Sequence, residues 1–259
     1  MTILPPLPRP GLSLKTLRVH QQGAVLSIEL STPEQGNAVT DMMLDDLRAV
    51  LDHQDPQVRV VVLSGAGDDF CLGGDRSEFV PTDPAAEGVR ISGIKARRVY
   101  EALTGNPAVT IARVQGRAVG AGLGLALACD LRVGSPDASF RLPELALGLP
   151  TAWAGILPRL INEVGTARAR DLVLTGRAVD AQEALSLSLL HKVVPAEAID
   201  AAVAAWAKPI IRRPPAALRV TKTLFNSYSA ATLLADASVL EAELMAAAVA
   251  ETHRAADAP

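Results

Sequence analysis

Two uninterrupted apolar stretches constrain the fold of this chain most strongly. Residues 58–65 (VRVVVLSG) and 108–116 (AVTIARVQG) are rich in β-branched and other apolar side chains. Such runs are typical of strands buried on both faces, which occur in parallel sheets covered by helices. Helical spacing over 40–54 and over 88–105 separates the strands, so the sequence predicts an α/β core.

The chain divides at about residue 195 into a core and a helical C-terminal region. The pattern becomes helical and alanine-rich after about residue 150, and almost all of residues 196–259 fits helices. Small alanine faces allow close helix packing, within the chain or against a neighbour, so we expect an oligomerisation region there. Residues 1–195 form the predicted core, with the proline-rich residues 1–13 as a loose arm.

The composition argues against several function classes. The net charge is −3 and aromatic residues make up 3% of the chain, so neither a basic nucleic-acid surface nor a stacking platform for bases is expected. No apolar run approaches the ~18 residues of a membrane span, and the first residues lack the features of a signal peptide. Two cysteines without a spaced motif indicate a reduced, cytoplasmic protein. Four scattered histidines predict no metal site.

A glycine triplet opens a predicted helix in the stretch GAGLGLALACD, residues 120–130. Gly120, Gly122 and Gly124 recur at every second position, although each costs roughly 1 kcal/mol relative to alanine inside a helix. Their spacing breaks the G-x-G-x-x-G dinucleotide fingerprint. Two interpretations remain: the glycines permit close helix packing, or they bring a ligand near the bare N–H groups of a helix N-terminus.

A second glycine-rich segment, FCLGGD at residues 70–75, follows the first buried strand directly. Gly73 and Gly74 free the backbone to present its N–H groups. Two main-chain donors from separate loops can converge on one oxygen, which is how an oxyanion hole is built. The two glycine segments therefore raise the hypothesis of an oxyanion hole, beside the plainer one of tight packing.

The chain resembles the crotonase (enoyl-CoA hydratase/isomerase) superfamily from about residue 15 to residue 255. The resemblance is carried, in the family's order, by TPEQGNAVT, VVLSGAGDDFCLGGD, VQGRAVGAGLGLALACDLRVGSPDASFRLPELALGL, ARARDLVLTGRAVDAQEAL and VVP. It implies a spiral core of ββα units, a C-terminal helical region, and homotrimers often paired into hexamers. It also implies an acyl-CoA thioester substrate held by the N–H groups of Gly74 and Ala121. No metal or redox cofactor is expected, since coenzyme A is part of the substrate.

The resemblance also bears on the reaction. Hydratases of the family carry two glutamates that position and split water; one position matches Glu144 here, whereas the other is Gly124. A single carboxylate suits proton transfer between two carbons of an enolate, so we expect an isomerase-type reaction. The apolar residues around Glu144 (LPELALGL) are expected to raise the pKa of its carboxyl group. The alternatives are hydration with one glutamate and a non-catalytic acyl-CoA binder.

Further substrate-binding residues are expected with less specific support. Asp75 either caps a helix or touches substrate, Cys71 fills a small apolar space beside the proposed hole, and Trp153 shapes the acyl pocket. Arg76 and Lys222 either bind coenzyme A phosphates as accessible cations or are solvated surface charges. The same group includes four small residues of the two glycine segments and of the TPEQGNAVT segment: Ala38, Gly73, Gly120 and Gly124.

Overall fold

A computed structural model describes residues 13–75, 85–231 and 240–256 of the chain. Its main sheet has six strands in the order β1-β2-β3-β4-β6-β9. All neighbours pair in parallel except β1 and β2, which form an antiparallel hairpin. The strands are β1 (Leu17–Gln22), β2 (Val25–Leu30), β3 (Val60–Gly65), β4 (Val109–Val114), β6 (Leu131–Gly134) and β9 (Lys192–Val193).

A second sheet consists of three short strands, one of which directly precedes the glycine triplet in the sequence. It comprises β5 (Arg117–Val119), β7 (Ser139–Arg141) and β8 (Val179–Asp180), with β7 in the middle. β5 and β7 pair in parallel, whereas β7 and β8 are antiparallel. The helix α3 starts directly after β5, and a short 3-10 helix, Glu144–Leu147, follows β7.

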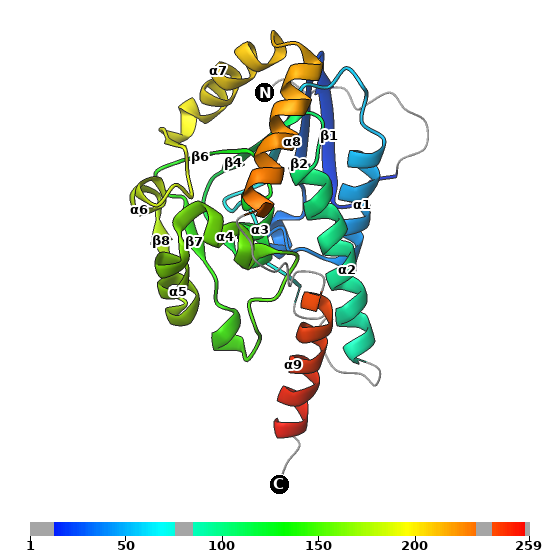
Figure 1. Ribbon diagram of the computed structural model, residues 1–259, viewed down its shortest axis with the longest axis vertical. Helices are drawn as coiled ribbons and strands as arrows, with labels where there is room; N and C mark the ends of the chain where they lie inside the picture. Colours follow the sequence, from blue (N-terminus) through cyan, green and yellow to red (C-terminus); the bar gives the residue numbers. More distant parts are fainter. Residues whose placement is uncertain (1–12, 76–84, 232–239, 257–259) are drawn as a thin grey trace.

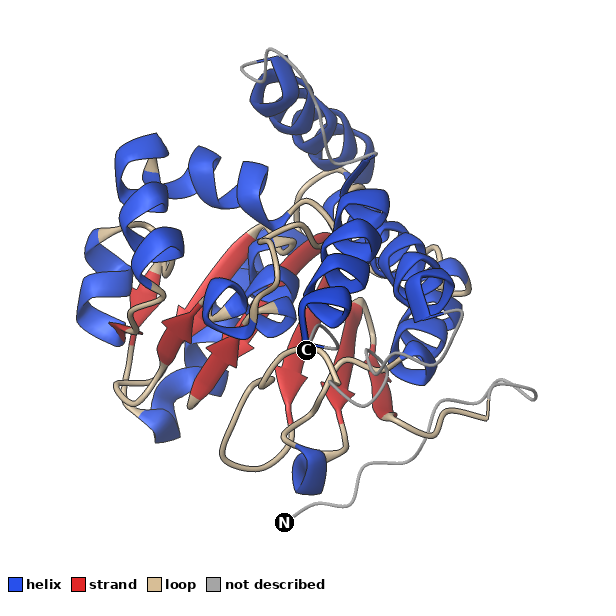
Figure 2. Ribbon diagram, turned by 90° about the horizontal axis from the view of Figure 1, so that it is seen from below, coloured by secondary structure: helices blue, strands red, loops and turns tan. Residues whose placement is uncertain are grey.

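Helices surround the sheets (Figures 1 and 2). The α-helices are α1 (Asp41–Asp52), α2 (Ala85–Thr104), α3 (Ala121–Leu127), α4 (Ile156–Val164), α5 (Thr166–Thr175), α6 (Ala181–Ser186), α7 (Ile199–Ile211), α8 (Pro215–Ala231) and α9 (Glu241–Ala256). Thr40 caps α1, since its hydroxyl accepts a hydrogen bond from the Met43 N–H at 3.1 Å. The predicted strand–helix alternation of the core is confirmed.

The main sheet is buried on both faces, as its valine-rich strands predict. In β3, Val61 and Leu63 belong to the large core that also contains α1, α2 and α3. Val60 and Val62 point to the opposite face, into a smaller apolar cluster with residues of α7. Alternate side chains of one strand thus contribute to two cores.

The C-terminal helices pack against the core. α7 contacts β3, β4 and β6, and α9 lies along α2, from which it extends away from the sheets in Figure 1. None of the described helices is both long enough and apolar enough to cross a membrane. The division near residue 195 and the oligomerising role of the last helices stay predictions, and most of the expected N-terminal arm, residues 1–12, lies outside the described part.

Candidate active site

The segment after β3 runs between two other parts of the chain. Cys71 donates its N–H to the Arg117 carbonyl and accepts from the Val119 N–H, at 3.1 and 2.9 Å. On the other side, the Val39 N–H donates to the Gly73 carbonyl at 2.8 Å, and Gly74 forms a parallel bridge with Val39. The FCLGGD loop is therefore fixed beside the strand that leads into α3.

Asn37 anchors this loop, and the sequence analysis missed it. Its side chain is fully buried, and its amide N–H₂ lies 2.9 to 3.3 Å from the carbonyl oxygens of Ala66, Asp69 and Phe70. Its own backbone has φ +52°, which asparagine tolerates better than most residues. Ala38, the next residue, is half-buried at the edge of the same loop.

The three glycines at the start of α3 face three different neighbours. Gly120 has φ +50° and ψ −118°, a conformation suited to glycine alone. A methyl group there would lie 2.9 Å from Oε1 of Glu144. A methyl group on Gly122 would lie 2.3 Å from the Cys71 carbonyl oxygen. Close packing and exposure of main-chain amides, the two interpretations of the triplet, are therefore compatible.

The two proposed donors lie on neighbouring segments. Gly73 has φ +103°, and a methyl group on it would lie 3.0 Å from the Val119 carbonyl oxygen and 3.9 Å from the Ala121 nitrogen. Ala121 is the first residue of α3, so its N–H has no partner within the helix. Within the described residues, neither the Gly74 N–H nor the Ala121 N–H donates a hydrogen bond. Both donors are thus available to a ligand.

Glu144 lies at the same helix start. The Gly120 N–H donates to the Arg141 carbonyl at 2.9 Å, which ties the end of β7 to the start of α3. Oε2 of Glu144 is buried and has no hydrogen-bond partner among the described residues. Burial raises the pKa of this carboxyl, while a hydrogen bond from its own main-chain N–H opposes the shift.

The direction of this pKa shift agrees with the expectation. Of the apolar stretch LPELALGL that was expected to surround the carboxyl, Leu142 is buried, whereas Leu145 and Leu147 are 45% and 37% exposed. The segment at Gly120 also lies against the carboxyl, since a methyl group there would lie 2.9 Å from Oε1.

The position of the missing second glutamate is filled. A methyl group on Gly124 would lie 2.5 Å from Cγ1 of Ile156 and 2.6 Å from Cε1 of Tyr100. Gly124 itself is buried. The residue is therefore a packing contact of α3, and its contact with substrate stays a prediction.

Tyr100, Trp153 and Cys71 are buried aromatic or sulfur-containing residues. Tyr100 is fully buried, and its hydroxyl donates to the Ala121 carbonyl oxygen at 2.5 Å. Trp153 is buried and close enough to the Tyr100 phenol to influence its pKa; its contact with an acyl chain stays a prediction. Cys71 is buried, which raises its pKa to about 12, so its thiol is a packing group rather than a nucleophile.

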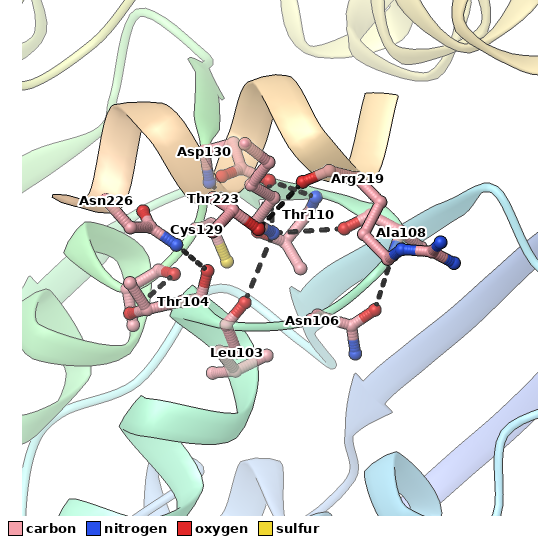
Figure 3. Close-up of polar contacts among 12 residues, drawn as sticks. Leu103, Thr104, Asn106, Ala108, Thr110, Cys129, Asp130, Arg219, Thr223 and Asn226 are labelled. Atoms are coloured by element: carbon pink, nitrogen blue, oxygen red, sulfur yellow. Dashed lines mark hydrogen bonds and ion pairs between the residues drawn. The ribbon is translucent and has the colours of Figure 1, made fainter. Parts of the chain in front are cut away.

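Lys222 is not the accessible cation that the sequence suggested. Its side chain is buried (8% of the residue exposed), and Nζ donates to Oδ2 of Asp130 at 2.7 Å and to the carbonyl oxygens of Ala108 and Leu103 at 3.0 and 3.4 Å. These acceptors converge from the end of α2, the residue before β4 and the segment between α3 and β6 (Figure 3). Lys222 has only three N–H donors, so the prediction that it binds phosphate is wrong.

The remaining predicted residues give less information. Arg76 lies outside the described residues. Asp75 is half-buried and donates its N–H to the Val39 carbonyl at 3.1 Å. In the described part of the chain, no three histidine, cysteine, aspartate or glutamate side chains gather as metal ligands. A groove of about 1830 Å³ lies elsewhere, over β1, β2 and α7, and contains none of the predicted site residues.

Comparisons with known proteins agree with this geometry. Residues 20–256 match the family model described as enoyl-CoA hydratase/isomerase. The chain is 32% identical over 219 residues to the short-chain-enoyl-CoA hydratase of Clostridium acetobutylicum, covering 83% of this chain and 82% of the relative.

Solved structures are similar over most of the chain. A Thermobifida fusca protein in complex with acetoacetyl-CoA is 32% identical, with a TM-score of 0.78, over 94% of this chain and 96% of that one. An enoyl-CoA hydratase/isomerase of Xanthobacter autotrophicus is 26% identical, with a TM-score of 0.83, over 91% and 88% of the two chains. The predicted crotonase fold is therefore confirmed.

Proposed function

The chain belongs to the enoyl-CoA hydratase/isomerase family, and from this premise we propose that it shifts the double bond of an enoyl-CoA thioester by proton transfer through Glu144. The observation that carries the proposal is Oε2 of Glu144, a carboxylate oxygen that is buried without a hydrogen-bond partner among the described residues and lies by the start of α3. The pKa of this carboxyl is raised by burial, which suits a base that works near neutral pH.

The proposed reaction starts with a 3-enoyl-CoA. Its thioester oxygen accepts hydrogen bonds from the N–H groups of Gly74 and Ala121, which makes the C2 protons more acidic. The Glu144 carboxylate removes one C2 proton, and the negative charge of the resulting dienolate spreads to the oxygen in the hole. The same carboxyl group then returns the proton to C4, which gives the 2-enoyl-CoA. Each donor in such a hole typically contributes about 3 kcal/mol to transition-state stabilisation.

The filled space beside Gly124 supports proton transfer over hydration. Two carboxyl groups suit the addition of water, because one can bind the water while the other delivers its proton. Here Ile156 and Tyr100 occupy the place of the second carboxyl. Nothing else in this scheme needs a group from outside the chain and its substrate, so we expect activity without metal or redox cofactor.

Replacing Glu144 by glutamine tests the proposal. The variant keeps the shape of the side chain but cannot accept a proton, so we expect kcat on a 3-enoyl-CoA to fall by about 10²- to 10⁴-fold. In deuterated water the protonated carboxyl exchanges with solvent in a fraction of turnovers before it delivers its proton to C4. Mass spectrometry should therefore find deuterium in part of the wild-type product and none in the variant's thioester. Unchanged isomerisation by the variant would refute the role of Glu144.

A hydratase is the second candidate, favoured by the name of the Clostridium relative. Rapid hydration of crotonyl-CoA by the wild-type protein would support it and would mean that one glutamate suffices. Tight binding of several acyl-CoA thioesters without turnover or deuterium exchange would instead support a non-catalytic binder.

We also propose that copies of the chain assemble through the C-terminal helices into a homotrimer or homohexamer. Four large apolar side chains of α8 are between 47% and 70% exposed: Val220, Leu224, Phe225 and Tyr228. An exposed apolar patch of this kind is typical of an interface. Light scattering that gives the mass of a single chain would contradict this assembly.

A further inference from the structure

The phenol of Tyr100 is a buried polar group that the proposed reaction does not use. It comes from α2, yet its hydroxyl reaches the first turn of α3 and donates to the Ala121 carbonyl oxygen at 2.5 Å. A carbonyl oxygen has two lone pairs. The phenol can therefore bind this oxygen in addition to the hydrogen bond of the helix itself.

Ala121 is held on both sides by this arrangement. On its N-terminal side, the Gly120 N–H donates to the Arg141 carbonyl at 2.9 Å. On its C-terminal side, the Tyr100 hydroxyl holds the Ala121 carbonyl. The Ala121 N–H lies between these two anchors. Together they restrict the backbone rotations that would change the direction of this N–H.

The ring of Tyr100 is itself held in place. Its Cε1 packs against Gly124, where a methyl group would lie only 2.6 Å away. On another side, the guanidinium carbon of Arg159 lies 6.0 Å from the ring centroid, and Nη1 of Arg159 donates to the Ala154 carbonyl at 2.6 Å. The phenol is therefore a fixed donor rather than one of several rotamers.

We propose that Tyr100 is a positioning residue that orients the Ala121 N–H for the thioester oxygen. The inference rests on the proposed function, because the Ala121 N–H needs a fixed direction only if it binds the thioester oxygen. The inference also explains why residue 124 is a glycine: the absence of a side chain there lets the phenol reach the first turn of α3. Burial raises the pKa of Tyr100 well above its ordinary value, with Cys71 and Glu144 acting in the same direction. The hydroxyl therefore remains a donor over the working pH range.

The test is Tyr100→Phe, which keeps the ring and removes the hydroxyl. The hydroxyl of Ser186, which is exposed, also donates to a main-chain carbonyl, that of Glu183 at 2.8 Å, so Ser186→Ala is the matched control. A small displacement of a catalytic group can lower the rate by up to about a hundredfold. We expect kcat of Tyr100→Phe to fall about tenfold, with KM within about twofold of wild type and Ser186→Ala unchanged.

A spectroscopic measurement separates orientation from general loss of structure. Butyryl-CoA carrying ¹³C at the thioester carbonyl has no double bond to shift, and the infrared frequency of that carbonyl reports how strongly the hole polarises it. We expect the bound ligand to absorb at lower frequency than the free one in wild type, and closer to the free value in Tyr100→Phe. Ile156→Val, which loosens the same packing without touching the hydrogen bond, should keep the wild-type frequency.

The outcomes are distinguishable. If butyryl-CoA bound to wild type shows no carbonyl shift, the proposed function itself fails. If wild type shows the shift and Tyr100→Phe shows the same shift and kcat, the positioning role fails. If Tyr100→Phe does not fold, or if Ile156→Val loses the carbonyl shift to the same extent, the phenol serves packing alone and the inference is overturned.

Discussion

Gly122→Ala should separate the two loops of the candidate site. The added methyl group would lie 2.3 Å from the Cys71 carbonyl oxygen and 2.8 Å from its Cβ. The oxygen belongs to the main chain, and the Cys71 N–H and carbonyl are both hydrogen-bonded to the strand beside them. Because this oxygen cannot rotate away from the methyl group, α3 has to withdraw by about 1 Å to reach an ordinary contact of 3.4 Å.

This withdrawal should affect both stability and activity. Inserting a methyl group into a packed core typically costs about 1 to 3 kcal/mol of unfolding free energy. A displacement of about 1 Å can lower the rate about a hundredfold, since Ala121 moves with α3 relative to Gly74. Urea denaturation measures the first effect, and kcat on a 3-enoyl-CoA measures the second.

Gly88→Ala is the matched control for this substitution. Gly88 lies in α2, is exposed, and has nothing within 4 Å of the place of a methyl group. Alanine is the better helix residue, so we expect a gain of about 0.5 to 1 kcal/mol and unchanged kcat. If Gly122→Ala behaves like this control in both assays, the close approach of α3 to Cys71 is wrong, and with it the geometry of the hole.

Two further predictions concern charged groups. Because burial raises the pKa of Glu144 in the folded state, its contribution to stability is present below the ordinary pKa and lost as the pH rises through the raised value. The melting temperature of Glu144→Gln should therefore exceed that of wild type by more at pH 7 than at pH 4. An equal difference in melting temperature at the two pH values would contradict this. Lys222→Met leaves Asp130 without its cation and should cost about 3 kcal/mol in urea denaturation, part of which Lys222→Met/Asp130→Asn should restore.

The local pattern of the chain predicted those features that depend on one segment at a time. The valines of β3 indicated burial on both faces, and Val60 and Val61 indeed belong to different cores. The glycine segments indicated unusual backbone at two loops. Glu144 was identified through the resemblance to the crotonase family, since a glutamate near a turn has no distinguishing pattern of its own.

Contacts between distant segments were missed or misjudged. Lys222 looks like a surface cation in sequence, but its partner Asp130 is 92 residues away. Asn37 and the carbonyl groups it binds are 29 to 33 residues apart. Tyr100 reaches Ala121 from another helix, over 21 residues. No periodicity in the chain records such pairs.

The sequence by itself determined the strands, the helices and the family of this protein, and it led to the proposal of one reacting carboxyl group. These follow from side-chain periodicity, from glycine's freedom of backbone rotation and from motifs that each lie within a short stretch. Only the tertiary structure decided what each polar group does, for example that Gly124 admits a tyrosine ring and that Lys222 is buried. The physical reason is that burial and hydrogen bonding depend on which distant segments meet, and packing fixes this only when the whole chain folds.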